Sequence, residues 1–219
     1  MMPRVSVVVP TYRRPDLLDR CLAALDTQTL DPGAYEVLVV DDADAAGTRR
    51  QVEAFAARAR PAVRYLAVSG RHGPAVARNV GWRAARGAIV AFTDDDTVAD
   101  PRWLAAGLAA FVDGVAGVAG RVAVPLPATP TDYERDAAGL EIGQFVTANC
   151  FYRRDALAAV DGFDERFEAA WREDSDLWFS LEAAGARLER CDAALVLHPV
   201  RPARFGVSLG QQRKAQFNA

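Results

Sequence analysis

The chain has 219 residues, of which 51% are hydrophobic, which suits one domain with an ample core. Its formal net charge is -3, so no overall positive field favours nucleic acid as a partner. No apolar run approaches the roughly 20 residues of a membrane helix, and the amino-terminal run is too short for a signal peptide. These features predict a soluble protein located in the cytoplasm.

The cysteines and the basic carboxyl end also bear on where the protein works. Cys21, Cys150 and Cys191 are odd in number and lack CxxC spacing, which predicts free thiols in a reducing compartment. No acidic residue follows Asp192, whereas four basic residues do: Arg201, Arg204, Arg213 and Lys214. This end is a candidate for peripheral contact with an anionic membrane or with phosphate, although a solvated tail is the commoner outcome.

The first hundred residues alternate between predicted strands and helices. Apolar runs predict strands at 5–9, 37–40, 63–68 and 88–93. Helical patterns occupy 15–27, 48–59 and 74–86. This alternation predicts an α/β fold with a doubly wound, mainly parallel sheet and helices on both faces. Such sheets bind ligands beyond the carboxyl ends of their strands.

The second half is less regular, and its predicted elements are shorter. Helices are expected at 101–111, 155–160 and 175–184, and strands at 115–124, 145–152 and 194–197. A Pro/Thr-rich segment at 125–131 predicts a mobile loop over the site, and 211–219 has the pattern of an amphipathic helix. No internal repeat or linker is evident, so the sequence predicts a single domain over 1–219.

Three consecutive aspartates, Asp94, Asp95 and Asp96, follow the apolar run at 88–92. Two unit charges about 4 Å apart repel by roughly 1 kcal/mol in water and about 4 kcal/mol near a protein surface. A bound cation would relieve this repulsion, and oxygen ligands suit Mg²⁺ or Mn²⁺. The alternative is a solvated acidic turn that caps the next helix. Polar residues at the ends of other predicted strands, 11–13 and 41–42, favour the metal interpretation.

Six motifs occur in a fixed order along the chain. They are VVVPTYR (7–13), VVDD (39–42), GPAVARNVG (73–81), FTDDD (92–96), GFDERF (162–167) and EDSDL (173–177). Their order resembles family 2 glycosyltransferases, enzymes of the GT-A fold that use nucleotide-activated sugars. The resemblance covers nearly the whole chain and implies a nucleotide-binding half at 1–100 and an acceptor-binding half at 101–219. Relatives often continue past the last residues, so the acceptor half is expected to lack a carboxyl-terminal element.

The resemblance implies a set of donor-binding residues. Contacts to the nucleotide are expected from Pro10, Thr11, Tyr12 and Arg13. Asp41 matches a position that accepts a hydrogen bond from the base or ribose, and Arg78 one that reaches the base or phosphates. Arg78 has an alternative role as an ion-pair partner of Asp41 or Asp94.

The aspartate triplet corresponds to the DXD motif of the family. Alignment within three identical residues is ambiguous by one position. The preferred assignment gives the ribose to Asp94 and the metal to Asp96, with Asp95 able to replace either. The implied cofactor is Mn²⁺ or Mg²⁺. His198 resembles an additional metal ligand of some members, although a lone histidine at a strand end is more often structural.

Glu173 and Asp174 correspond to the pair that faces the acceptor. Asp174 matches the general base of inverting members, which takes the proton of the acceptor hydroxyl. A purely structural role is the alternative, because acidic residues stabilise the first turn of a helix. Trp171 is a candidate to stack on an acceptor sugar, with core burial as the alternative.

Together these features predict a metal-dependent, inverting glycosyltransferase. Its donor would be a nucleoside diphosphate-sugar, with UDP as the default and GDP or dTDP as alternatives, and its acceptor a hydroxyl of a glycan, a lipid-linked molecule or a small molecule. One alternative is a nucleotidyltransferase that makes a nucleotide sugar, but the segment 10–14 lacks the glycine-rich loop of that class. The other is a non-catalytic domain that binds a nucleotide sugar or glycan.

Overall fold

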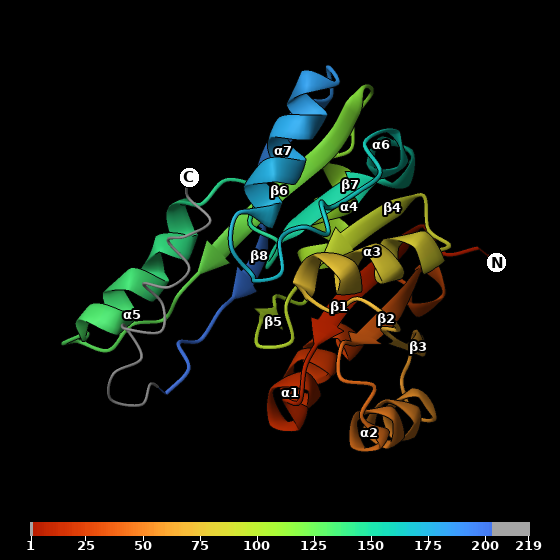
Figure 1. Cartoon of the computed structure of the whole chain (residues 1–219), viewed down its shortest axis with the longest axis vertical. Coiled ribbons are helices and arrows are strands. Elements are labelled where there is room, and N and C mark those ends of the chain that lie inside the picture. The colour runs from red at the N-terminus through yellow and green to blue at the C-terminus, as the bar shows by residue number, and fades with distance from the viewer. Residues whose placement is uncertain (1, 203–219) are drawn as a thin grey trace.

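The computed structural model describes residues 2–202, which form one eight-stranded sheet with helices on both faces (Figure 1). The strands are β1 (Val5–Thr11), β2 (Tyr35–Asp41), β3 (Ala62–Ala67), β4 (Ile89–Phe92), β5 (Val98–Ala99), β6 (Val115–Ala123), β7 (Cys150–Arg153) and β8 (Arg187–Leu197). The helices are α1 (Pro15–Asp26), α2 (Ala46–Ala56), α3 (Pro74–Ala84), α4 (Trp103–Ala109), α5 (Asp132–Ala137), α6 (Arg154–Ala159) and α7 (Glu173–Ala183). Two 3-10 turns are η1 (Pro32–Ala34) and η2 (Ala138–Ile142).

The order of the strands is β3-β2-β1-β4-β7-β6-β8-β5. Strand β1 is parallel to both β2 and β4, and β2 is parallel to β3, as the alternation of the first hundred residues predicts. Strand β7 is antiparallel to both of its neighbours, β4 and β6, whereas β6 and β8 are parallel. The chain winds from β1 toward β3 on one side and toward β4 on the other. A crevice therefore opens between the carboxyl ends of β1 and β4, where such folds bind ligands.

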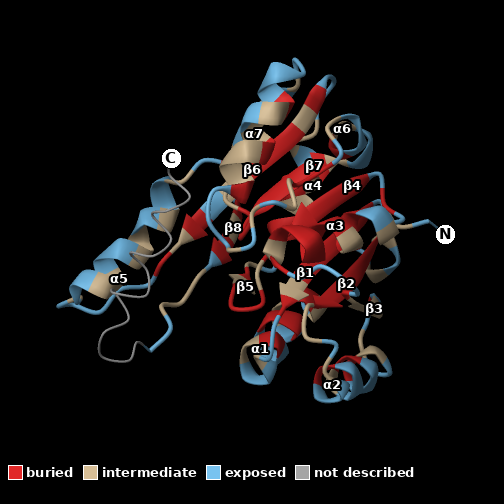
Figure 2. Ribbon diagram, in the orientation of Figure 1, coloured by how far each residue is buried: buried red, intermediate tan, exposed pale blue. Residues whose placement is uncertain are grey.

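The central strands of the sheet are buried (Figure 2). Their side chains pack into two hydrophobic cores, one on each face of the sheet. On β1, Val7 and Val9 point to the core that α1, α2 and α4 cover. Val8, between them, points to the opposite core, which α3, α6 and α7 cover. Because both faces are buried, these strands read as continuous apolar runs. The predicted α/β architecture is confirmed.

The second half departs from prediction in three places. The strand expected at 145–152 begins only at Cys150, and Phe145 has a φ of +50°, which a regular strand does not accommodate. Strand β8 begins at Arg187, well before the expected 194–197. The segment 125–131 contains no regular element, as expected, but a helix that was not predicted, α5, follows it and lies at the side of the sheet (Figure 1).

Three further expectations concern the thiols, the membrane and the carboxyl end. All three cysteines are free, as predicted. Among residues 2–202, none of the helices has the length and apolar character needed to cross a bilayer. The helix predicted at 211–219, together with Arg204, Arg213 and Lys214, lies outside the described residues.

Candidate active site

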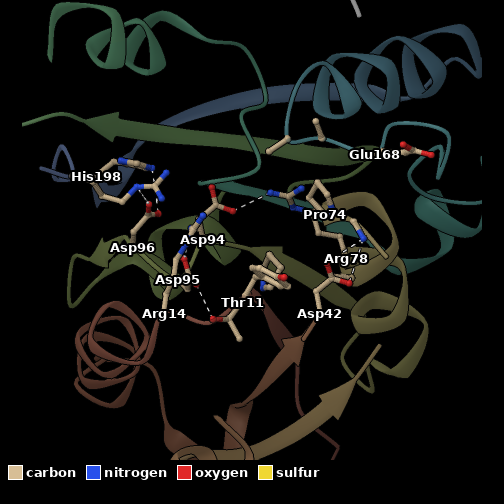
Figure 3. A pocket seen from close by; sticks show the side chains of 17 residues that line it. Thr11, Arg14, Asp42, Pro74, Arg78, Asp94, Asp95, Asp96, Glu168 and His198 are labelled. Carbon is tan, nitrogen blue, oxygen red and sulfur yellow. Dashed lines mark hydrogen bonds and ion pairs between the residues drawn. The ribbon is translucent and has the colours of Figure 1, made fainter. Parts of the chain in front are cut away.

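A cavity of about 370 Å³ opens at the carboxyl ends of β1 and β4, a size within the usual range of ligand pockets (Figure 3). Most of the predicted donor and metal residues line it: Pro10, Thr11, Tyr12, Arg78, Asp94, Asp95, Asp96 and His198. The three aspartates point in different directions, toward Arg78, Thr11 and His198 respectively (Figure 3). The structure thus distinguishes three carboxylates that the sequence leaves equivalent.

Asp95 faces the first strand. Its side chain is buried and accepts hydrogen bonds from Thr11 Oγ1 at 2.7 Å and from Arg14 at 3.1 Å. Burial raises the pKa of Asp95, although both partners favour the ionised form. Arg14 was not among the predicted site residues. The neighbouring Arg13, which was, has a φ of +53° and lies over the ring of Tyr12 rather than in the cavity wall.

Asp94, Asp96 and His198 form a candidate metal site. Each offers one ligand atom, and these atoms lie within 4.8 Å of one another. The backbone N–H of His198 donates to the carbonyl of Ala123, which fixes the histidine at the end of β8 beside β6. Carboxylate oxygens suit Mg²⁺ and Mn²⁺, and an imidazole nitrogen suits first-row transition ions. The donor set therefore fits a divalent ion, and it includes Asp94, to which the sequence assigned the ribose.

Arg78 connects the aspartate triplet to the acidic pair. Its guanidinium donates to Asp94 at 3.0 Å and to Glu173 at 2.9 Å. The side chains of Arg78 and Glu173 are each only 3% exposed. A buried charge is costly unless it is paired. The two ion pairs therefore hold the guanidinium of Arg78 between Asp94 and Glu173. Asp94, one of the two predicted alternative partners of Arg78, is the one that it contacts.

Glu173 and Asp174 begin α7 but have different partners. Glu173 is buried against Arg78, whereas the carboxylate of Asp174 accepts a hydrogen bond from the N–H of Ser175 at 2.8 Å. Burial raises the pKa of Asp174 above its ordinary value, while that N–H and the charge of Arg78 oppose the rise. Burial likewise raises the pKa of Glu173, and Arg78 opposes it. The wall of the cavity reaches residues 168–170, just before this pair.

The two aspartates that follow β2 have separate structural roles. Asp41 is fully buried and accepts hydrogen bonds from the N–H groups of Ala43 and Ala45, so it shapes the loop after the strand. Asp42 lines the cavity and accepts from the N–H of Gly73 at the start of α3. The sequence singled out Asp41, but the carboxylate in the cavity wall is that of Asp42.

Trp171 lies three residues before Asp174 and is 37% exposed. It is therefore a surface side chain and not part of the core. It does not line the cavity at β1 and β4. The structure also adds three residues with charged side chains that sequence reasoning did not place in the site: Arg14, Glu168 and Arg201.

Comparisons with known proteins agree with this geometry. The family model described as glycosyl transferase family 2 matches residues 6–163. The glycosyltransferase AglE of Haloferax volcanii is 30% identical over 223 residues, which cover 96% of this chain and 71% of AglE. The pre-mycofactocin glycosyltransferase of Mycobacterium tuberculosis is 32% identical over 90% of this chain and 43% of its own length. A validoxylamine A glucosyltransferase of Streptomyces hygroscopicus is 39% identical over 50% of this chain and 24% of its own length.

Solved structures show the same fold. A mannosyltransferase from Pyrobaculum calidifontis in complex with GDP-Man and Mn²⁺ has a TM-score of 0.75 at 24% identity, with 99% of this chain and 62% of that chain covered. Residues 1–349 of S. aureus TarS in complex with UDP-GlcNAc give 0.70 at 23% identity, with 92% and 60% covered. The chain thus spans less than two thirds of these structures and of most of the relatives above.

Proposed function

The chain belongs to glycosyl transferase family 2 and has the GT-A fold. We propose that this glycosyltransferase is metal dependent and inverts the configuration at the anomeric carbon of the sugar that it transfers. The observation that carries the proposal is the arrangement around Arg78. This one buried side chain joins Asp94 of the candidate metal site to Glu173, the neighbour of the candidate base Asp174. The proposed ligand of the metal that binds the leaving group and the neighbour of the proposed base thus share one ion-pair partner.

In this proposal Asp94, Asp96 and His198 hold Mn²⁺ or Mg²⁺. The ion would neutralise charge that develops on the diphosphate of the departing nucleotide. The donor is a nucleoside diphosphate-sugar, supported by the complexes of the mannosyltransferase with GDP-Man and of TarS with UDP-GlcNAc. These two neighbours differ in their base, so UDP and GDP are both candidate nucleotides for this chain.

The donor nucleotide is proposed to lie along the end of β1. Tyr12 offers a half-exposed ring for stacking, and Pro10 and Thr11 share its wall of the cavity. The carboxylate at the end of β2 selects an N–H or O–H donor of the base or ribose. The sequence predicts Asp41 for this contact, but Asp41 is fully buried, whereas Asp42 lines the cavity wall. The contact is therefore proposed for Asp42.

Asp174 is proposed as the general base. It takes the proton of an acceptor hydroxyl while that oxygen bonds to the anomeric carbon and the bond from that carbon to the diphosphate oxygen breaks. The bonding electrons leave with the diphosphate, and this single displacement inverts the anomeric centre. A pKa raised by burial favours this role because a stronger base accepts the proton more readily. Glu173, which is paired with Arg78, is proposed to position the adjacent Asp174.

The acceptor is proposed to be a hydroxyl of a glycan, a lipid-linked molecule or a small molecule, bound by the half at 101–219. Trp171 is its proposed stacking surface. Contact of the basic end with a membrane and a location in the cytoplasm remain predictions. The nucleotidyltransferase alternative finds no support among the relatives above, which are glycosyltransferases.

The test is a thermal-unfolding panel with UDP, GDP and dTDP, each with and without Mn²⁺. Ligand at a hundredfold excess over its Kd stabilises the folded state by about 2.7 kcal/mol, so binding is readily seen as a shift in Tm. We expect one nucleotide to give the largest shift and that shift to require Mn²⁺. Equal shifts with and without the ion would contradict metal dependence.

Two matched variants sharpen this panel. Asp96→Asn should lose the Mn²⁺-dependent part of the shift, because it removes a proposed ligand carboxylate. Asp192→Asn, which changes a largely exposed aspartate on β8 paired with Arg190, should keep it. Loss of the shift in both variants would show that the effect does not arise at the proposed site.

A further inference from the structure

Arg201 pairs with the carboxylate of Asp96, one of the proposed metal ligands. The Nε atom of Arg201 lies 3.1 Å from Asp96 Oδ2, and the Nε2 atom of His198 lies 3.4 Å from Asp96 Oδ1. The side chain of Asp96 is only 3% exposed, whereas that of Arg201 is 44% exposed. A half-exposed cation therefore compensates a buried carboxylate.

We propose that Arg201 exchanges partners during the reaction cycle. It pairs with Asp96 when the metal site is empty and with the diphosphate of the donor when the ion is bound. This inference rests on the proposed function, because it assumes that Asp96 is a metal ligand. It assigns a donor-binding role to a residue beyond the six motifs of the sequence.

The first step is competition between two cations. Arg201 satisfies the buried carboxylate of Asp96, which would otherwise be a costly uncompensated charge. The Nε atom of Arg201 lies 3.1 Å from this carboxylate. A divalent ion bound to the same carboxylate would therefore repel the guanidinium. The two cations therefore alternate, and metal binding releases Arg201.

The second step is the destination of the released arginine. Arg201 lines the same cavity as Asp94 and Tyr12, where the diphosphate would enter. A guanidinium presents a planar fork of donors that matches two phosphate oxygens. Arg14 pairs with Asp95, which is not a proposed ligand. Arg78 pairs with the proposed ligand Asp94, but it also pairs with Glu173 and so keeps a carboxylate partner when an ion binds. Of the arginines in the described part of the cavity wall, Arg201 is thus the one that loses its carboxylate partner to the ion at Asp96.

The consequence is cooperative binding of metal and donor. The ion by itself must break the pair of Arg201 with Asp96, so it binds weakly. A nucleoside diphosphate offers the released arginine a new partner and so favours the state that accepts the ion. By linkage the ion must then increase the affinity for the nucleotide by the same factor.

The experiment measures Mn²⁺ binding directly, by electron paramagnetic resonance of the free ion, in the whole chain and its variants. Arg201→Ala should bind Mn²⁺ alone roughly three- to fivefold more tightly than the wild type, the effect expected when a half-exposed ion pair is removed. Added UDP or GDP should then increase the Mn²⁺ affinity of this variant less than it does in the wild type. Arg201→Lys, which retains the charge, should keep the weak affinity of the wild type for Mn²⁺ alone.

Arg190→Ala is the matched control. Arg190 lies on β8 and pairs through Nε with Asp192 at 2.7 Å, but away from the cavity wall. It should leave Mn²⁺ binding unchanged. The same tightening in Arg190→Ala would reveal a general charge effect and overturn the exchange.

The remaining outcomes separate this inference from the proposed function. Equal or weaker Mn²⁺ binding by Arg201→Ala, with undiminished enhancement by nucleotide, would overturn the exchange and leave metal dependence intact. Absence of Mn²⁺ binding in every variant, even with UDP or GDP, would overturn metal dependence and the exchange with it.

Discussion

Glu173 and Asp174, two adjacent carboxylates at the start of α7, differ in the groups that they contact. These contacts, and not the residue types, give the two carboxylates different proposed roles. Glu173 is tied to Arg78 at 2.9 Å, so its charge is already compensated. Asp174 accepts hydrogen bonds from the adjacent Ser175 and lies close enough to Arg78 for its pKa to be affected. Asp174 is therefore better placed to take a proton from an incoming hydroxyl.

Asp174→Asn is expected to lower the rate of transfer by about a hundredfold to ten-thousandfold, the usual contribution of a general base. Burial raises the pKa of Asp174, and only the ionised carboxylate acts as a base, so the wild-type rate should fall as the pH drops through that raised pKa. The pH dependence of nucleoside diphosphate release measures this limb, which the variant should lack.

The stability of the same variant provides a check on folding. The folded-state pKa of Asp174 lies above its unfolded value, so ionising this carboxylate costs stability at neutral pH and protonating it at lower pH restores that stability. Asp174→Asn should thus unfold at the same or a higher temperature than the wild type. Asp176→Asn, on the same turn of α7, should retain transfer. Full turnover by Asp174→Asn would contradict its assignment as the base.

At the scale of elements, α3 owes its position to a glycine. A Cβ atom at Gly81 would collide with the side chain of Val8 on β1, so the helix can lie this close to the sheet only without a side chain there. The close approach places Arg78, one turn earlier, over the end of β4. The packing at Gly81 thereby determines where the guanidinium of Arg78 lies in the site.

Gly81→Ala is expected to destabilise the protein by about 1–3 kcal/mol, the usual cost of inserting a methyl group into a well-packed core. The matched control is Gly47→Ala on α2, where an added Cβ meets no atom within 4 Å. Because alanine favours the helix over glycine, this control should be neutral or stabilising by up to about 1 kcal/mol. Urea denaturation measures both, and equal effects would contradict the packing argument.

The sequence predicts the elements of the first half well and those of the second half less well. Strands β1, β2 and β4 are buried on both faces, so their apolar runs are unmistakable. The first half of β8 carries charged and largely exposed residues, which conceal it from a search for apolar runs. Strand β5 has only two residues and exists through its pairing with Val196 and Leu197, which no local pattern reveals.

One unpredicted helix did have a local signal. The helix α5 begins with a capping box in which Thr131 and Glu134 exchange hydrogen bonds. The spacing of these two residues is visible in the sequence. The Pro/Thr-rich composition of the preceding segment favours a loop and so opposes this signal.

The motifs predict where the site lies but not how its charges pair. The aspartate triplet and Arg78, which the motifs single out, line one cavity. The choice of Arg13 over Arg14 depends on the backbone turn at Arg13, whose φ of +53° is not readable from residue types. The pairing of Arg201 with Asp96 joins residues more than a hundred positions apart, and only the sheet topology brings them together.

At the scale of the whole molecule, the two halves share one sheet. Strand β4 of the first half pairs with β7 of the second, and Arg78 adds an ion pair between α3 and α7. Within residues 2–202, this continuity supports the proposal of a single domain with a nucleotide-binding half and an acceptor-binding half.

Arg78→Met is expected to cost about 3–5 kcal/mol of unfolding free energy, because it leaves Glu173 as an uncompensated buried charge. Adding Glu173→Gln should recover part of this stability, since the stranded charge is then removed, but not the transfer activity. Urea denaturation of both single variants and of the double variant measures the coupling between the two residues.

Arg83→Met is the matched control for this cost. Arg83 lies on the same helix and also has two carboxylate partners, Asp161 and Glu165, but it is half-exposed. Its loss should cost only about 0–1 kcal/mol. Similar costs for Arg78→Met and Arg83→Met would contradict the idea that a buried pair joins the halves.

The pairing of β5 with β8 has a consequence for the order in which the protein is made. Strand β5 directly follows the aspartate triplet, yet its hydrogen-bonding partner is at Val196 and Leu197, almost a hundred residues later. A chain still emerging from the ribosome can form β1 to β4 early, but it cannot pair β5 or bring His198 to the aspartates. The candidate metal site therefore cannot be completed until His198 has been synthesised.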